Sequence, residues 1–484
     1  MKKILYFVAL FAVLAGAVAA LNSCGGSSPL EKAIRQALVQ QDTTQARFDS
    51  LCSIVTAAPD RYKDLLNEAG EPDVMALGEL IDKVGAELHP PVRWDVSRYA
   101  RKQLSLTIYF ERSGSMVPYD APGSRGQLKK AVNDLINFFP SSDKVSINIV
   151  NDAIYPYTGS IDEFLQDRNI YASTQGVGNA SYTDFQKIFT DILRVQQPGN
   201  VSVVVSDLIY SPADTRDVSL EKIFIEENSL ATRIFKQYKG KSIVVHQLMG
   251  DYRGKYYPYN GKPFNYAGQR PFYLVVVADS RVMDAMAANA EFHQFMHPSA
   301  AVHTYRFNQA EQGVDCCVLP DWKDNAGRFR VDHHDPLRLI KCEGDKTTGV
   351  LCFSVAAKLD GLQKDAKFLA DANNYQLKSM NGFQLKVSPI TSDMITGNNK
   401  SYLEGKTHLL TFTGKMQNPR DEITVSLTNE FPAWIEHSSA TTDVSPSVAN
   451  FATTTLGLKE FLGGIASAFG TGGNYTTITL KVER

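Results

Sequence analysis

The sequence lacks the residues and runs that mark several common classes of protein. It has only six cysteines in 484 residues, and no Cys-x-x-Cys pair, which excludes zinc-ribbon and thioredoxin-type sites. It has no basic block and its formal charge is −2, so no nucleic acid is expected as a partner. After the N-terminal segment, no apolar run is long enough to span a bilayer.

Signatures of familiar enzymes are also missing. The chain contains no Gly-x-Ser-x-Gly, His-Glu-x-x-His or P-loop motif, and its nine histidines show no pairing typical of nucleophilic catalysis. The run His333-His334-Asp335 is interpreted as a solvated loop, because neighbouring residues of a strand point to opposite sides. A metal-assisted hydrolase is therefore the least favoured function, and we expect that the protein is not an enzyme.

The N-terminus is typical of an exported, lipid-anchored bacterial protein. Lys2 and Lys3 precede an apolar run with small residues near its end, which predicts a signal peptide over residues 1–23. The segment Leu-Asn-Ser-Cys24 resembles a lipobox, which implies cleavage before Cys24 and lipidation of that residue. Glycine and serine, rather than acids, fill positions 25–28, which favours the periplasmic face of the outer membrane over the cell surface. A secreted protein with a chance cysteine is the alternative.

Three regions follow the signal peptide. Residues 24–97 hold a tether and segments with helical spacing of apolar residues, which predict a small helical domain or a helical lead-in to the next domain. Residues 98–312 alternate strand-like and helix-like segments, which predicts an α/β doubly wound, mostly parallel sheet covered on both faces. Residues 313–484 hold short alternating strands between turns, which predicts a C-terminal β-sandwich-like domain of immunoglobulin-like size.

Three local features refine this outline. Residues 250–270 carry five tyrosines and an Asn-Gly turn signal between two strand-like runs, which predicts an antiparallel hairpin; packing on a neighbouring domain is favoured over a binding surface. Cys342 and Cys352 flank a second turn-like segment and form either a disulfide or two free core thiols. An apolar helix is expected near residues 456–470, within the β-rich region.

Five side chains with oxygen ligands follow strand-like or loop segments of the α/β region. Glu111 ends an apolar run, and Ser113 and Ser115 come directly after it; Thr183 precedes a helix-like segment, and Asp207 ends a valine-rich run. In open wound sheets, ligands bind beyond the carboxyl ends of the strands, so these side chains are expected at one rim. Carboxylate and hydroxyl oxygens suit hard cations, and they predict a site for Mg²⁺ or Mn²⁺.

The order of these residues resembles the von Willebrand factor type A domain, also called an integrin I-type domain. The family motif is Asp-x-Ser-x-Ser after the first strand, a Thr in a later loop and an Asp after the fourth strand. Ser113, Ser115, Thr183 and Asp207 match it, whereas Glu111 stands in place of the first Asp. The resemblance covers roughly residues 100–300 and implies a metal-ion-dependent adhesion site, whose coordination shell is completed by an acidic side chain of a protein partner.

Two functions are consistent with these features. The first is a membrane-anchored protein-binding module that uses its cation to bind a protein ligand with an exposed acidic side chain, in adhesion or envelope assembly. The second is a metal-free structural scaffold of an envelope complex. In that alternative, the longer side chain of Glu111 leaves the site degenerate, and Ser113 and Ser115 only cap the following helix.

Overall fold

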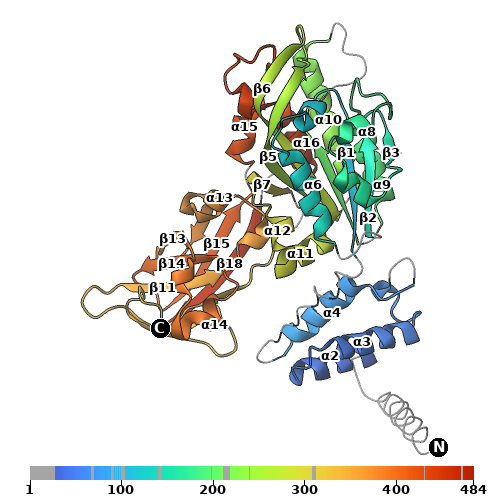
Figure 1. Cartoon of the computed structure of the whole chain (residues 1–484). Coiled ribbons are helices and arrows are strands. Elements are labelled where there is room, and N and C mark those ends of the chain that lie inside the picture. The colour runs from blue at the N-terminus through green and yellow to red at the C-terminus, as the bar shows by residue number, and fades with distance from the viewer. Residues whose placement is uncertain are drawn as a thin grey trace, which may run out of the picture. The chain divides into compact units, whose positions relative to one another are not determined.

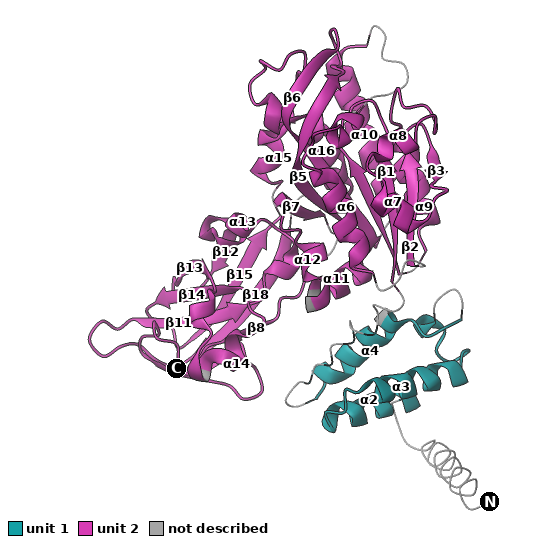
Figure 2. Ribbon diagram, viewed as in Figure 1, with its two compact units in different colours: residues 1–102 teal, residues 103–484 magenta. Residues whose placement is uncertain are grey.

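The chain forms two compact units, residues 1–102 and 103–484 (Figure 2). The computed structural model describes residues 28–484 except 67–69, 89–91, 93, 95, 97–98, 100–103, 140–143, 198, 211–217, 239, 308–311, 430 and 470–472. The predicted signal peptide and Cys24 lie outside the described residues. Within the described part, no helix combines the length and the apolar character that crossing a membrane requires.

The first unit is helical, as predicted. Its helices are α2 (Pro29–Val39), α3 (Gln45–Ala57) and α4 (Val74–Ala86), with a 3-10 helix, η1 (Lys63–Leu65), before α4. Helix α2 begins at a capping box, in which Ser28 and Glu31 exchange side-chain and backbone hydrogen bonds. The spacing of apolar residues over 60–69 also predicts a helix, and this prediction is wrong in the described part of that segment. Only η1 forms there, because Leu66 instead pairs with Pro72 in a β-bridge.

The second unit is built around a seven-stranded mixed sheet with the strand order β3-β2-β1-β4-β6-β5-β7 (Figure 1). The strands are β1 (Ser105–Glu111), β2 (Val145–Val150), β3 (Ile154–Pro156), β4 (Asn200–Ser206), β5 (Lys241–Tyr256), β6 (Phe264–Asp279) and β7 (Ala301–Phe307). Strand β1 runs parallel to β2 and β4, whereas the other pairs of this sheet are antiparallel. The α/β class is confirmed, but the prediction of a mostly parallel sheet is wrong.

The long hairpin of β5 and β6 accounts for the antiparallel half of the sheet. The two strands pair from Lys241 with Asp279 to Tyr256 with Phe264, so no helix separates them. The turn contains Gly261, whose φ of 138° is a backbone conformation that glycine adopts without steric cost. The predicted antiparallel pairing is confirmed. Strand β6 also pairs antiparallel with β4, so it runs in the opposite direction to β1, β2 and β4.

Helices cover both faces of this sheet, as predicted. The helices are α6 (Gln127–Asn137), α7 (Ile161–Gln166), α8 (Ile170–Ser173), α9 (Phe185–Val195), α10 (Leu220–Lys236), α11 (Ser280–Ala288) and α12 (His293–Met296). Tyr109 and Val204 belong to one buried cluster together with α9 and α10. Ile108 and Val203 belong to another, together with α6, α11 and α12. Alternate strand residues thus face opposite layers, which explains the continuous apolar runs.

The β-rich region contains a five-stranded sheet, β12-β15-β18-β10-β9, and a four-stranded sheet, β13-β14-β11-β8. Their strands are β8 (Cys316–Val318), β9 (Arg328–Val331), β10 (Arg338–Glu343), β11 (Leu351–Ala357), β12 (Tyr375–Lys378), β13 (Gln384–Pro389), β14 (His408–Gly414), β15 (Arg420–Thr428) and β18 (Asn474–Glu483). Phe353 and Phe412 of the smaller sheet share one core with Val425 and Leu480 of the larger. Cys342 and Cys352 lie in different sheets and are free thiols.

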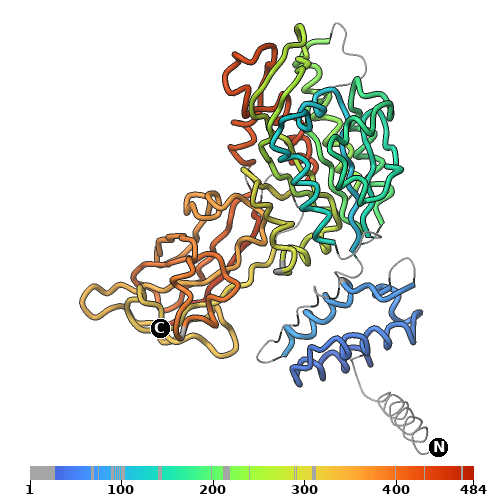
Figure 3. The backbone as a smooth tube through the Cα atoms, in the orientation of Figure 1, coloured from blue at the N-terminus to red at the C-terminus, as the bar shows by residue number. Residues whose placement is uncertain are grey.

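One stretch of the C-terminal region returns to the α/β layers instead of joining the β-rich sheets. It contains α15 (Ala433–His437), β16 (Ser439–Ala440), a 3-10 helix, η9 (Phe451–Thr453), β17 (Thr455–Leu456) and α16 (Leu458–Phe469). Helix α16 packs on α10, where Asn228 donates to the Glu460 carbonyl at 3.0 Å and Thr232 to the Gly464 carbonyl at 3.0 Å. The residues before η9, drawn in red, lie beside the β5–β6 hairpin (Figure 3). The expectation that this helix belongs to the β-rich region is therefore wrong.

The contact between α16 and α10 depends on a small residue. A Cβ atom added at Gly464 would lie 2.5 Å from the Asn228 carbonyl oxygen, whereas one added at Gly463 would meet its nearest neighbour at 3.4 Å. We expect Gly464→Ala to lower the free energy of unfolding by about 1–3 kcal/mol, because the helices must move apart. Gly463→Ala is the control and should be neutral or stabilising, since alanine favours a helix. Equal losses for both variants in urea unfolding would contradict this.

Candidate metal centre

The candidate site lies where strand order reverses along the sheet. The chain passes from β1 to β2 on one side and later enters β4 on the other side of β1. Glu111 is the last residue of β1, and Asp207 directly follows the last residue of β4. Because β1 and β4 are parallel, both acids leave the sheet at the same rim. Such a switch point is where open α/β sheets bind ligands.

The loop after β1 brings two hydroxyl groups to this rim. Ser113 and Ser115 are 3.0 Å apart between their Oγ atoms. Between them, the backbone N–H of Gly114 donates to the Ala180 carbonyl at 3.1 Å, which ties this loop to the segment that carries Thr183. Ser113 lies close enough to the Glu111 carboxyl group to lower its pKa, and Ser115 acts in the same way on Asp207. The two serines thus connect the two acids.

Thr183 and Asp207 reach the site from separate segments. The Thr183 hydroxyl donates to Oε1 of Glu111 at 2.5 Å, and α9 begins two residues later. Asp207 accepts a hydrogen bond from the Ile209 N–H at 3.1 Å. Leu208, between them, has a φ of 55°, which costs free energy for a residue with a side chain and turns the backbone sharply at this point. The structure therefore brings all five predicted side chains together.

The two acids are buried, and one of their oxygens has no partner. Glu111, Thr183 and Asp207 are each about 1% exposed. Oε2 of Glu111 is buried and, within the described part of the chain, accepts no hydrogen bond. A buried carboxylate oxygen without a partner is costly. A cation beside it would remove that cost, so the donor set fits a hard divalent metal.

The pKa values of both acids are raised. The pKa of Glu111 is raised to about 8; burial is the largest cause and the neighbouring Asp207 adds to it, whereas hydrogen bonds from Ser206, Thr183 and Ser113 oppose the change. Burial also raises the pKa of Asp207, against hydrogen bonds from Ser115 and the Ile209 N–H and the charge of Arg270. Two buried acids side by side resist ionisation, and a divalent cation would reverse that preference.

Arg270 on β6 is the nearest candidate for a built-in positive charge, but it is committed elsewhere. Its guanidinium carbon lies 4.3 Å from the ring centre of Phe451 and 5.0 Å from that of Tyr256, and it donates to the Phe451 carbonyl. No ion pair joins Arg270 to Asp207, although both are described residues and the charge of Arg270 lowers the pKa of Asp207. The guanidinium therefore acts from a distance and does not replace a cation.

Other acids near this rim already accept hydrogen bonds from backbone N–H groups. Asp184 caps α9 by accepting from the Lys187 N–H at 2.9 Å. Asp152 accepts from the Asn179 N–H at 2.8 Å, and Asp120 from the Ile170 N–H at 3.1 Å. These bonds give each acid a structural role, so none of the three needs to be counted among the metal ligands.

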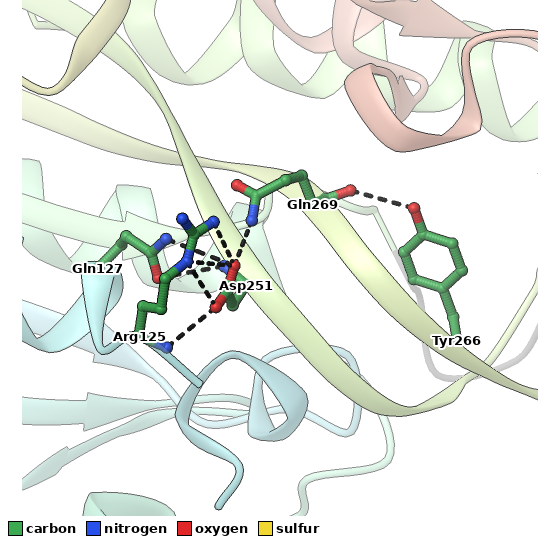
Figure 4. Close-up of polar contacts among 5 residues, drawn as sticks. All are labelled: Arg125, Gln127, Asp251, Tyr266 and Gln269. Atoms are coloured by element: carbon green, nitrogen blue, oxygen red, sulfur yellow. Dashed lines mark hydrogen bonds and ion pairs between the residues drawn. The ribbon is translucent and has the colours of Figure 1, made fainter. Parts of the chain in front are cut away.

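The carboxylate of Asp251 on β5 fixes the segment that leads from the loop of Ser113 and Ser115, here called the serine loop, to α6 (Figure 4). It accepts hydrogen bonds from the backbone N–H of Arg125 at 3.0 Å, from Arg125 Nη2 at 2.9 Å and from the Gln269 amide. These bonds from Arg125 hold the pKa of Asp251 well below its usual range, so it stays ionised. The serine loop is thereby held between two anchored points, Ala180 and Asp251.

The tyrosine-rich hairpin also reaches the rim, which the sequence pattern did not reveal. A Cβ atom at Gly114 would lie 3.4 Å from the Tyr257 ring, and the side chain of Tyr257 is half exposed. Lys255 lies 5.8 Å from the centre of that ring. Tyr252 and Tyr256 are buried, and Tyr256 donates to Asp443 at 3.0 Å, so the preferred prediction of packing is confirmed for this part. The five tyrosines were visible in the sequence, but not their position.

Comparisons of the chain with protein-family models, with curated proteins and with solved structures found no match.

Proposed function

We propose that the second unit contains a von Willebrand factor type A-like domain that binds Mg²⁺ or Mn²⁺ and uses it to hold an acidic side chain of a protein partner. Glu111, Ser113, Ser115, Thr183 and Asp207 would hold the cation. The observation that carries this proposal is the buried Oε2 of Glu111, which has no hydrogen-bond partner among the described residues and lies within a group of four further oxygen-bearing side chains.

The strand order supports the domain assignment in part. The arrangement β3-β2-β1-β4, with β1 parallel to its two neighbours, is expected for the half of a wound sheet that carries the site. Strand β6 departs from a mostly parallel sheet, because it runs antiparallel between β4 and β5. The departure lies beyond β4 and leaves the rim at β1 and β4 intact.

The ligand set explains the choice of metal and of partner. Mg²⁺ prefers about six oxygen ligands in a regular arrangement and usually keeps several waters. Two acids and three neutral hydroxyl groups leave the bound ion able to accept one more carboxylate, and this is the chemistry that the metal supplies. Glu111 is one methylene longer than Asp, and its Oε1 is held by Thr183 at 2.5 Å, which reduces the freedom of the longer side chain.

Tyr257 and Lys255 supply a surface for the partner beside the metal. An exposed tyrosine gives a large contact area at small entropic cost, and a lysine attracts an acidic segment. We propose that the domain works at the bacterial envelope, anchored by lipid on Cys24 and on the periplasmic face of the outer membrane. Adhesion and envelope assembly are both compatible with this role.

The test has a metal arm and a partner arm. Mn²⁺ binding is measured by electron paramagnetic resonance on the wild type, Asp207→Asn and Tyr257→Ala, with competition by Mg²⁺. We expect one bound Mn²⁺ in the wild type and Tyr257→Ala, and none in Asp207→Asn. Envelope proteins are then captured with Mg²⁺ or EDTA. A partner should be lost with EDTA and with Asp207→Asn, and bound ~10-fold more weakly by Tyr257→Ala.

Each result distinguishes the two functions. A wild type that binds no Mn²⁺, or a partner captured equally well with EDTA, would contradict the proposal and favour the metal-free scaffold. Asp184→Asn is the matched control, because Asp184 is an acid at the same rim but serves as the N-cap of α9. It should leave both Mn²⁺ binding and partner capture unchanged.

A further inference from the structure

We propose a second metal site, formed by His293, His297 and Asp360, that takes Zn²⁺ rather than Mg²⁺. His293 is the first residue of α12, His297 directly follows its last residue, and Asp360 begins a 3-10 helix, η5 (Asp360–Leu362). The potential ligand atoms of these three residues all lie within 4.8 Å of one another.

The two histidines lie at the two ends of α12, the first as its first residue and the second as its C-cap, and their rings stack on each other. Their ring centres are 4.8 Å apart and nearly parallel, at 30°. Nε2 of His293 lies 3.9 Å from Oδ2 of Asp360. Ligands of a tetrahedral zinc at 2.0–2.1 Å are about 3.4 Å apart, so the site must close by about 1 Å or less on this side. The side chain of His293 is 60% exposed and has room to move.

Neighbouring groups hold the inner histidine as a metal ligand needs to be held. Nε2 of His297 lies 2.9 Å from Nε2 of the Gln363 side-chain amide. Nδ1 is free for a metal when this amide turns, so that its oxygen accepts a hydrogen bond from Nε2–H of His297. Gln363 is fully buried, and its φ of 54° is strained for a residue with a side chain. Its Oε1 has no partner in the described part of the chain. A hydrogen-bond acceptor at the second ring nitrogen is the usual way in which a ligating histidine is oriented.

A third histidine, His246, lies near His297 but is not among the three clustered ligands. His246 on β5 is 1% exposed, and its Nε2 is buried without a partner in the described structure, while Nδ1 bonds Thr304 at 2.9 Å. His297 is close enough to affect its pKa. A site of nitrogen donors and one carboxylate suits zinc.

Zinc at this position would brace two regions of the second unit. Helix α12 packs in the core beside the seven-stranded sheet, whereas η5 comes directly after β11 of the β-rich region. Helix α12 and strand β11 are labelled in Figure 1. Helix α11 already contacts η5. A metal bond from α12 to Asp360 would therefore fix the junction between the two sets of sheets.

The test uses the whole protein, purified without a polyhistidine tag. Zn²⁺ binding is measured by calorimetry, and Co²⁺ is added as a probe because its visible absorption reports nitrogen ligands. We expect one Zn²⁺ per chain at micromolar affinity or tighter, and at least a 10-fold loss of affinity in His293→Ala and in Asp360→Asn. His293 is exposed enough that its removal should not unfold the protein. His333→Ala, in an exposed loop, is the control and should bind zinc like the wild type.

Zinc binding that is absent, or unchanged in both His293→Ala and Asp360→Asn, would overturn this proposal. The variant Asp207→Asn distinguishes this site from the proposed adhesion site. It should abolish the response to Mn²⁺ and leave the Co²⁺ spectrum and zinc affinity unchanged. A loss of Co²⁺ absorption in Asp207→Asn, with His293→Ala unaffected, would also overturn the assignment to α12 and η5.

Discussion

Mg²⁺ or Mn²⁺ is expected to stabilise the wild-type protein against unfolding, and EDTA to remove that gain. A cation at 100 times its dissociation constant adds about 2.7 kcal/mol if it binds only the folded state. The physical reason is the arrangement around Glu111 and Asp207, two buried acids whose pKa values are raised by burial. Thermal unfolding of the wild type with Mg²⁺, with Mn²⁺ and with EDTA measures the effect.

Substitution of the acids separates metal binding from simple stability. Glutamine resembles the protonated form of Glu111, so Glu111→Gln should cost little free energy of unfolding in EDTA at pH 7. The same variant should lose the stabilisation by Mg²⁺, and so should Asp207→Asn. Asp184→Asn keeps a side-chain oxygen that caps α9 about as well, so its stability should stay close to that of the wild type in every buffer, with the full response to Mg²⁺.

Two outcomes would contradict the metal site. A wild-type transition that is identical with Mg²⁺, Mn²⁺ and EDTA would mean that Glu111, Ser113 and Asp207 form a closed polar cluster without a cation. A response to Mg²⁺ that persists in both Glu111→Gln and Asp207→Asn would mean that the cation binds elsewhere on the chain.

The local part of this site could be predicted from the sequence because each step depends on neighbouring residues. An apolar run that ends in Glu111 reports a buried strand and its end, and Ser113 and Ser115 follow within one turn. Thr183 and Asp207 were predictable for the same reason, since each comes directly before a helix or after a strand. The rule that ligands bind at the carboxyl ends of strands then placed them at one rim.

The longer-range part was not predictable, because it depends on which surfaces meet. The absence of a helix between β5 and β6 showed that they form a hairpin, but not that β6 would enter the sheet next to β4. The sequence of helix α16 shows only that this helix must pack on an apolar partner. Its actual partner, α10, lies over 200 residues earlier in the chain. The positions of Tyr257 and Arg270 near the site follow from the hairpin register, which no local pattern reports.

Glu227 on α10 is expected to make the protein less stable as the pH rises above about 4.5. It is 2% exposed, and neither carboxyl oxygen has a hydrogen-bond partner in the described part of the chain. Burial raises the pKa of Glu227 well above its ordinary value, and Glu460 on α16 raises it further. Its contribution is therefore fully present below the pKa of the unfolded chain, and is lost as the pH rises towards the folded pKa, by up to about 1.4 kcal/mol per pH unit.

Replacing this acid by its amide should remove that loss. Glu227→Gln cannot ionise, so we expect it to unfold at a higher urea concentration than the wild type at pH 8, by about 1–4 kcal/mol, and to differ little at pH 5. EDTA is present throughout, so that the proposed metal sites do not contribute. Glu226→Gln changes the exposed neighbour and should keep the wild-type dependence on pH. If Glu227→Gln is less stable than the wild type at pH 8, Glu227 is ionised in the folded protein, and the contact between α10 and α16 must contain a positive charge or ordered water that stabilises it.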